Sequence, residues 1–111
     1  MEDNQIPKIG VIVAGAWGTV LGNLLADKEY MVDLWVREKE VYDQIMVKRM
    51  NETFLPGIVL DHRLNPVKTY EEASVDKDIA FIVVPSYVFR NVLIDMRPYL
   101  PKEVSLITAT K

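Results

Sequence analysis

Four short apolar runs rich in β-branched residues constrain the fold more than any other feature of this sequence. Each run has the length of a strand, and most lack alternation of polar and apolar residues, which is typical of strands buried on both faces of a parallel sheet. Asp33 is the exception and predicts one more exposed face. The four runs are Ile9–Val13, Met31–Val36, Ile79–Val84 and Val104–Ala109.

Helical patterns separate these runs. Between the second and third runs the chain is less regular, and there we expect a turn at Pro56-Gly57, a short edge-like strand at Leu64–Lys68 and a short helix at Tyr70–Ser74. The alternation predicts an α/β fold, a Rossmann-type doubly wound parallel sheet in a three-layer αβα arrangement. Longer helices are predicted at Trp17–Lys28, Lys39–Asn51 and Ser86–Tyr99, the last with Ser86 as its N-cap.

Composition limits the kinds of function. With 111 residues the chain suffices for one domain and not for two. A net charge of -3 argues against general nucleic-acid binding, and a single histidine (His62) without cysteine argues against a zinc site. The apolar runs fall short of the ~20 residues of a membrane helix, and the acidic start is unlike a signal peptide. We expect a cytoplasmic protein without metal, nucleic-acid partner or membrane insertion.

The turn after the first run looks like a phosphate-binding turn with one glycine missing. Gly15 and Gly18 keep the last two glycines of the pattern G-x-G-x-x-G, and Val13 stands at the first. A β-branched residue prefers extended angles, so we predict that Val13 ends the strand. Gly15 and the amides of Ala16 to Gly18 would then face the phosphates. By spacing alone, close packing of a helix on a strand explains the turn equally well.

Five short motifs follow one another along almost the whole chain, from about Lys8 to Lys111. They are Trp17-Gly-Thr, Trp35-Val-Arg37, Leu55-Pro-Gly-Ile58, Val84-Pro-Ser86 and Thr108-Ala-Thr-Lys111. Together they resemble NAD(P)-dependent glycerol-3-phosphate dehydrogenase; one motif alone is weak, but five in register are specific. The resemblance implies an oxidoreductase with NAD or NADP as cofactor. Its reaction is reversible hydride transfer between NAD(P)H and dihydroxyacetone phosphate, giving glycerol 3-phosphate, a glycerophospholipid precursor.

The resemblance also implies roles for particular residues. Arg37 matches an arginine beside the adenosine end of the cofactor, where an arginine also tolerates the 2′-phosphate of NADP. Pro85 and Ser86 match the strand end near the nicotinamide ribose, and Lys111 matches a catalytic-site lysine that faces the substrate. The phosphate-binding turn is matched by Gly15, Ala16, Trp17 and Gly18.

Simpler explanations exist for some of these residues. Arg37 would otherwise be a surface arginine paired with Glu38 or Glu40, and both Trp17 and Trp35 are expected to pack rather than touch a ligand. One further residue departs from the family: Glu29 stands where it usually has a glycine after the first helix. A glycine suits the left-handed position after a helix, so we expect this helix to end differently or with local strain.

The chain ends within a predicted strand and within one of the motifs. The resemblance therefore implies that residues 1–111 are a partial N-terminal NAD(P)-binding domain with an incomplete sheet. The family's second domain, a helical domain that binds the substrate, would be absent from this chain, and the chain alone would be inactive. An unpaired sheet edge favours association, a homodimer included. Two other functions stay open, a non-catalytic αβ association module with a degraded turn and a related hydroxyacid or ketopantoate-type reductase. The Trp17-Gly-Thr and Leu55–Ile58 motifs argue against the reductase.

Overall fold

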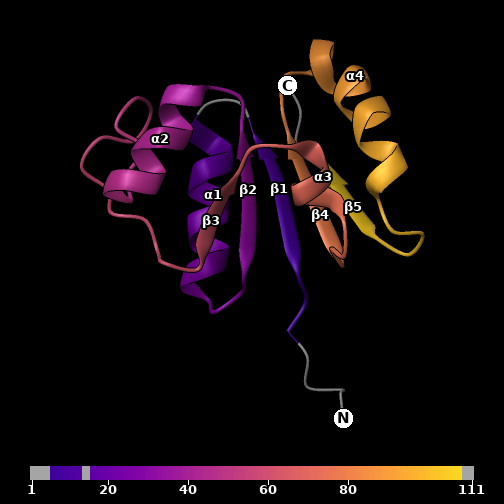
Figure 1. Cartoon of the computed structure of the whole chain (residues 1–111), viewed down its shortest axis with the longest axis horizontal. Coiled ribbons are helices and arrows are strands. Elements are labelled where there is room, and N and C mark those ends of the chain that lie inside the picture. The colour runs from indigo at the N-terminus through magenta and orange to yellow at the C-terminus, as the bar shows by residue number, and fades with distance from the viewer. Residues whose placement is uncertain (1–5, 14–15, 109–111) are drawn as a thin grey trace.

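Strands and helices alternate along the chain (Figure 1). The computed structural model describes residues 6–13 and 16–108, and within them it contains five strands, four α-helices and one 3₁₀ helix. In chain order these are β1 (Ile9–Val13), α1 (Ala16–Asp27), β2 (Val32–Val36), α2 (Lys39–Lys48), β3 (Leu64–Val67), α3 (Tyr70–Ser74), β4 (Ile79–Val83), α4 (Ser86–Met96), η1 (Arg97–Tyr99) and β5 (Ser105–Thr108).

Every predicted strand and helix is present, with ends shifted by a few residues. β1 ends at Val13, which confirms that prediction. α2 ends earlier than predicted because Arg49 takes a left-handed conformation with φ 58°. The last predicted helix divides into α4 and a 3₁₀ turn, where Pro98 has no N–H for an α-helical bond.

The five strands form one parallel sheet in the order β3-β2-β1-β4-β5. The chain builds outwards from β1 to β3, crosses back and continues from β4 to β5. This is the Rossmann-type doubly wound topology predicted from the sequence. It places the topological switch point between β1 and β4, the place where ligands bind in open sheets of this kind.

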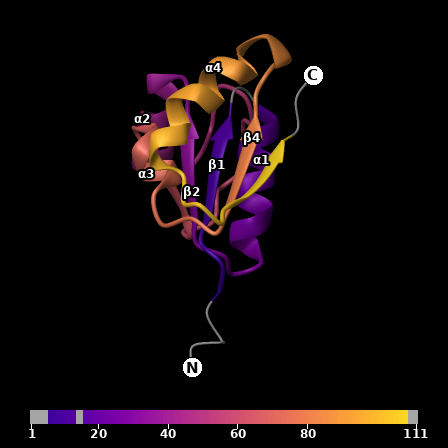
Figure 2. The same ribbon diagram turned by 90° about the vertical axis from the view of Figure 1, so that its right-hand side faces the viewer.

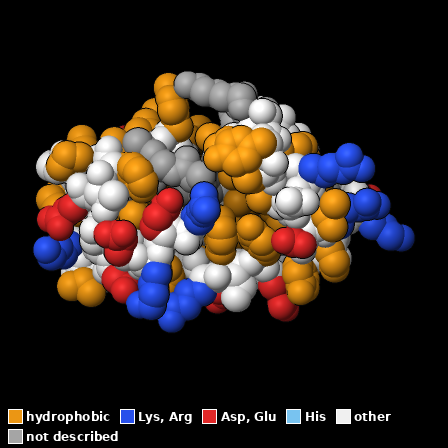
Figure 3. Space-filling view, turned by 90° about the horizontal axis from the view of Figure 1, so that it is seen from above, with side chains coloured by type: hydrophobic (Ala, Val, Ile, Leu, Met, Phe, Trp, Pro, Cys, Tyr) orange, Lys and Arg blue, Asp and Glu red, His pale blue; other side chains and the backbone are white. Residues whose placement is uncertain are grey.

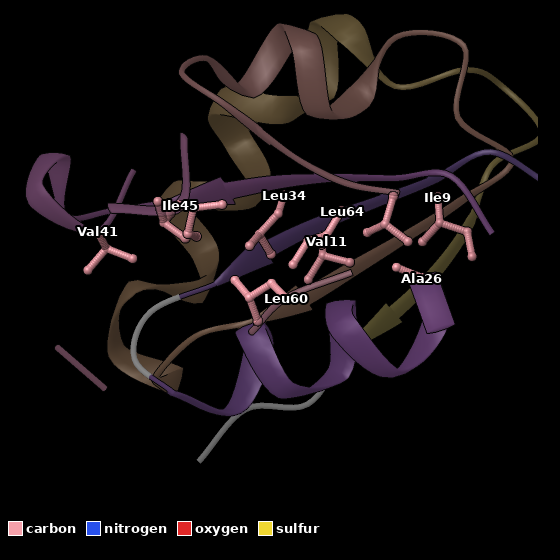
Figure 4. Close-up of a cluster of buried hydrophobic side chains, with 10 residues drawn as sticks. Ile9, Val11, Ala26, Leu34, Val41, Ile45, Leu60 and Leu64 are labelled. Atoms are coloured by element: carbon pink, nitrogen blue, oxygen red, sulfur yellow. The ribbon is translucent and has the colours of Figure 1, made fainter. Parts of the chain in front are cut away.

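Helices cover both faces of the sheet (Figures 1 and 2). Apolar residues of α1 and α2, including Ala26 and Ile45, join Val11 and Leu34 in a buried cluster on one face (Figure 4). Residues of α3 and α4 join Ile12 and others in a second cluster on the opposite face. Within the part of the chain that the structure describes, no helix is long and apolar enough to cross a membrane.

The edge strand β5 departs from the prediction that the apolar runs are buried on both faces. All four of its residues are exposed, including Leu106 at 41% and Ile107 at 45%. β5 pairs only with β4 at one edge of the sheet, and none of its residues joins either buried cluster, so its faces are not covered. The prediction of a fully buried strand is therefore wrong here.

Glycine at position 10 lets α3 approach the sheet closely. A Cβ built on Gly10 would overlap the carbonyl oxygen of Ala73 in α3. Because that oxygen belongs to the backbone, a side-chain rotation cannot relieve the overlap. The short helix α3 thus depends on a glycine in the central strand.

Asp33 lies on the more exposed face of β2, which confirms that prediction, and it takes part in an ion pair. The Nζ atom of Lys77 lies 2.9 Å from the Asp33 carboxylate, and the Lys77 side chain is only 8% exposed. Lys77 also donates to the backbone carbonyls of Glu72 and Val75 at 3.1 Å each. On its other side Asp33 accepts a hydrogen bond from Asn65 at 3.0 Å. The charge on β2 is thus paired under the turn that follows α3.

The end of α1 adopts the left-handed conformation despite having no glycine. Glu29 has φ 75°. Its N–H donates to the carbonyl of Ala26 at 2.9 Å, and the N–H of Tyr30 donates to the carbonyl of Leu25 at 3.2 Å. These two bonds define a Schellman motif with Glu29 at the C′ position. The helix thus ends as it would with a glycine at this position. Of the two expectations, a different ending or local strain, the structure shows local strain at Glu29.

Candidate functional site

Three strands end at the same level beside the switch point. Val13, the last residue of β1, pairs with Val36 of β2 on one side and Val83 of β4 on the other. The residues that follow these strands therefore meet at one edge of the sheet, the carboxyl edge. Figure 3 views the molecule from above this edge, where apolar and charged side chains are mixed.

The N-terminus of α1 begins at this edge, directly after residues 14–15. Its first turn, Ala16-Trp-Gly-Thr19, carries no acidic side chain. The first N–H groups of a helix lack intrahelical partners, and the helix dipole favours an anion near them. Gly18 is buried, which suits a close approach of α1 to the sheet.

Trp17 does not pack in the core as expected. Its side chain is 67% exposed at the start of α1, so the packing prediction is wrong for this residue. Trp17 thus presents a large aromatic surface beside the turn whose amides are expected to bind phosphate.

Arg37 follows β2 and is exposed at the same edge. Among the described residues, no ion pair joins it to Glu38 or Glu40. The backbone carbonyl of Glu38 accepts from Val41 and Tyr42 at the start of α2, and its side chain makes no capping bond. The geometry thus leaves the pairing explanation for Arg37 without support.

A second cation near Arg37 is already engaged. Lys39 lies 2.9 Å from the carboxylate of Asp43, one turn along α2. The hydrogen bond to Asp43, followed by its charge, raises the pKa of Lys39. Because this ammonium is exposed and has its own acceptor, Arg37 is the better candidate for a ligand phosphate.

At the end of β4, Pro85 rather than Ser86 caps α4. Pro85 has the extended angles φ −59° and ψ 147°, and its carbonyl accepts from the N–H of Val88 at 3.1 Å. Ser86 is the first helical residue and is exposed, so the N-cap predicted for it is wrong. The first turn of α4 also lacks acidic residues. Two helices of opposite sheet faces thus begin at this edge without acidic side chains in their first turns.

Trp35 packs as expected. Its indole Nε1 donates to the carbonyl of Lys68 at 3.1 Å, and its ring lies 4.6 Å from that of Tyr70 with a 41° tilt. Burial is the main cause that raises the pKa of Tyr70; the charge of Asp95 raises it further and that of Arg37 lowers it. This aromatic pair supports the edge of the sheet below Arg37.

Two predicted site residues lie outside the part of the chain that the structure describes. Gly15 and Lys111 lie beyond residues 6–13 and 16–108. The structure therefore brings together Ala16, Trp17 and Gly18 with Arg37 and Pro85-Ser86, and leaves the two others as predictions.

Sequence reasoning missed two residues that fasten the first turn of α1. Thr19 and Asn51 are both fully buried, and the Asn51 amide donates to the Thr19 hydroxyl at 3.1 Å. It also missed Gly22, where a Cβ would lie 3.0 Å from Cδ1 of Leu64. The one sign of the Thr19–Asn51 pair in the sequence was the polar residue Thr19 within an apolar helical pattern.

Comparison with known proteins agrees with this geometry. Residues 8–111 match the family described as NAD-dependent glycerol-3-phosphate dehydrogenase N-terminus. This chain belongs to that family. Membership decides against a ketopantoate-type reductase and favours a nucleotide-binding domain over an association module.

Individual relatives carry the same description. The chain is 43% identical over 103 residues to glycerol-3-phosphate dehydrogenase [NAD(P)+] of Syntrophobacter fumaroxidans, covering 93% of this chain and 30% of the relative. It is 45% identical over 104 residues to the enzyme of that name from Geobacter sulfurreducens, covering 94% and 31%. The chain thus spans about a third of the length of the curated relatives that it matches.

A solved structure supports the fold. The crystal structure of glycerol-3-phosphate dehydrogenase from Coxiella burnetii matches with a TM-score of 0.87 at 28% identity. The match covers 95% of this chain and 32% of the other. The five-stranded sheet described above therefore corresponds to the fold of about one third of that enzyme.

Proposed function

We propose that this chain binds NAD or NADP as the nucleotide-binding part of a glycerol-3-phosphate dehydrogenase. The observation that carries the proposal is the shared level at which β1, β2 and β4 end beside the switch point. Two helix N-termini without acidic residues begin there, and Arg37 follows β2 at the same edge. These features suit a ligand with a pyrophosphate in the middle and an adenosine at one end.

Each group of residues has a distinct task in this proposal. Gly15 and the amides of Ala16, Trp17 and Gly18 bind the pyrophosphate. Arg37 lies beside the adenosine and accepts a 2′-phosphate when NADP is bound. Pro85 and Ser86 flank the nicotinamide ribose, and Lys111 faces the substrate.

The proposed reaction is reversible hydride transfer between NAD(P)H and dihydroxyacetone phosphate, giving glycerol 3-phosphate. Such transfer requires the substrate to be held against the nicotinamide. Since the chain spans about a third of its relatives, we assign it the partial N-terminal domain, with the helical substrate domain outside it. We expect cofactor binding and no turnover from this chain alone, a cytoplasmic location, and self-association into a homodimer.

Titration of the chain with NADH and with NADPH tests the cofactor role. Saturable binding of either nucleotide, followed by ligand fluorescence, is the expected result. A chain that is folded by circular dichroism and shows no saturable binding would exclude the cofactor role and favour the association module. Turnover of dihydroxyacetone phosphate by this chain would instead contradict its catalytic incompleteness.

A variant of Arg37 tests its assignment. Arg37→Gln removes the charge beside the adenosine and is expected to weaken NADPH binding about tenfold, with a smaller effect on NADH. Arg97→Gln is the matched control, because Arg97 follows the far end of α4 and is exposed. Equal effects of Arg37→Gln on both nucleotides would show that Arg37 does not contact the 2′-phosphate.

A further inference from the structure

The connection between α2 and β3 is long and yet well tied together. It runs over residues 49–63 without a helix or a regular strand, whereas most connections have ~4–6 residues. The guanidinium of Arg49 donates to the carbonyls of Asp61 and Leu64, and the N–H of Leu60 donates to the carbonyl of Arg49 at 2.7 Å. An isolated antiparallel bridge joins Met50 and Val59. These bonds close the base of the connection, which we call the 49–63 loop.

This loop is fastened to α1 by two side-chain hydrogen bonds. Asn51 Nδ2 donates to Thr19 Oγ1 at 3.1 Å, and the N–H of Asp61 donates to Asn23 Oδ1 at 2.7 Å. Thr19 and Asn23 are four residues apart and share one face of the helix. Leu60 adds an apolar contact, since it lies in the buried cluster beside α1 (Figure 4).

The bond to Thr19 is the more consequential one because of its place in the helix. Thr19 belongs to the first turn, whose N–H groups have no partner within the helix. Thr19 and Asn51 are both fully buried, so neither side chain reaches a ligand or water at the surface. The second polar atom of Asn51, Oδ1, accepts from the N–H of Phe54 at 3.1 Å, which orients the amide. The loop thus restrains the turn that would carry the phosphate.

We propose that Thr19 and Asn51 are positioning residues for cofactor binding: the 49–63 loop holds the first turn of α1 in the orientation that binds the pyrophosphate. The inference rests on the proposed function. Donors that are already oriented bind an anion without the entropic cost of ordering them first. Loss of the Asn51–Thr19 bond therefore weakens cofactor binding although neither residue touches the cofactor.

The test compares Thr19 variants in this chain by NADH titration. Thr19→Val keeps the shape and removes the hydroxyl, and we expect the Kd for NADH to rise about tenfold. Thr19→Ser restores the acceptor and is expected to bind NADH as the unaltered chain does. Ile9→Val serves as the control for stability alone, because Ile9 is buried at the opposite end of β1. It is expected to lower the melting temperature without changing the Kd.

Each outcome decides between positioning and mere stabilisation. An equal Kd for Thr19→Val and Ile9→Val, measured where both are folded, would overturn the proposal. If Thr19→Val does not fold, Thr19→Ala replaces it, since the smaller side chain leaves room for a water on the Asn51 amide. A failure of the proposed function is recognised separately, because the unaltered chain would then bind no NADH at all.

Discussion

Glu29 holds a backbone conformation that costs an L-residue about 1–2 kcal/mol. Its φ of 75° is imposed by the two Schellman bonds that end α1. Glycine adopts this conformation without the Cβ penalty but loses more entropy on folding. We expect Glu29→Gly to stabilise the chain by about 1 kcal/mol, which raises the melting temperature by roughly 4–8 °C.

The control for this prediction is Glu29→Ala. It removes the same carboxylate and keeps the Cβ, so its stability in urea unfolding is expected to stay near that of the unaltered chain. If alanine stabilised the chain as much as glycine, the gain would come from the lost charge and the strain would be irrelevant.

The ionisation of Asp61 is expected to make the stability of the chain depend on pH in the acid range. The hydrogen bond from the backbone N–H of Arg63 is the main cause that lowers the pKa of Asp61 from 3.8, and the charges of Arg63 and His62 act in the same direction. A carboxyl whose pKa is lower in the folded chain than in the unfolded chain stabilises the folded state at every pH above its pKa in the unfolded chain. This stability is lost as the pH falls from that value through the pKa in the folded chain. Between about pH 5 and pH 2, Asp61→Asn is therefore expected to lose less stability than the unaltered chain. Parallel losses in urea titrations at each pH would show that Asp61 contributes nothing.

At the scale of elements, the contact between β1 and α3 leaves no room for a side chain at position 10. Gly10→Ala adds a Cβ that overlaps the Ala73 carbonyl oxygen, so α3 must shift away from the sheet. Overpacking of this kind typically costs about 1–3 kcal/mol. Urea unfolding with an unchanged m-value and a lower midpoint is the expected result. If Gly10→Ala left the stability unchanged, α3 would shift away from the sheet without cost and Gly10 would not be required for close packing.

The elements themselves can be predicted because each depends on a local pattern. The apolar runs indicate where each strand ends, and parallel strand ends place Gly18, Arg37 and Pro85 at one edge of the sheet. Side-chain pairs cannot be predicted in this way. Asn51 donates a hydrogen bond to Thr19 across 32 residues of sequence, and Lys77, in the turn after α3, forms an ion pair with Asp33 on β2. Such pairs depend on how the layers pack. The cap of α4 was missed because Pro85 and Ser86 are both compatible with a helix start.

At the scale of the whole molecule, the uncovered strand β5 predicts self-association of this chain. Its outer edge has no neighbouring strand among the described residues, and its Leu106 and Ile107 side chains are exposed. Unpaired edges pair with other chains, and a lysine on the edge opposes this. We expect sedimentation to depend on protein concentration, and Ile107→Lys to shift the chain towards the monomer. Val47→Lys, on the exposed side of α2, is the control for added charge.

Cofactor binding is expected to stabilise the whole fold because the proposed site joins its parts. The ends of β1, β2 and β4 meet there, and α1 and α4 begin there from opposite faces. A ligand that binds only the folded state at a hundred times its Kd adds about 2.7 kcal/mol of stability, a rise in melting temperature of roughly 11–22 °C. NADH should produce this rise in thermal unfolding, whereas adenosine, which lacks the phosphates, should produce little. An equal rise with adenosine would place the binding energy on the base and sugar, and the helix N-termini would then not be the anion site.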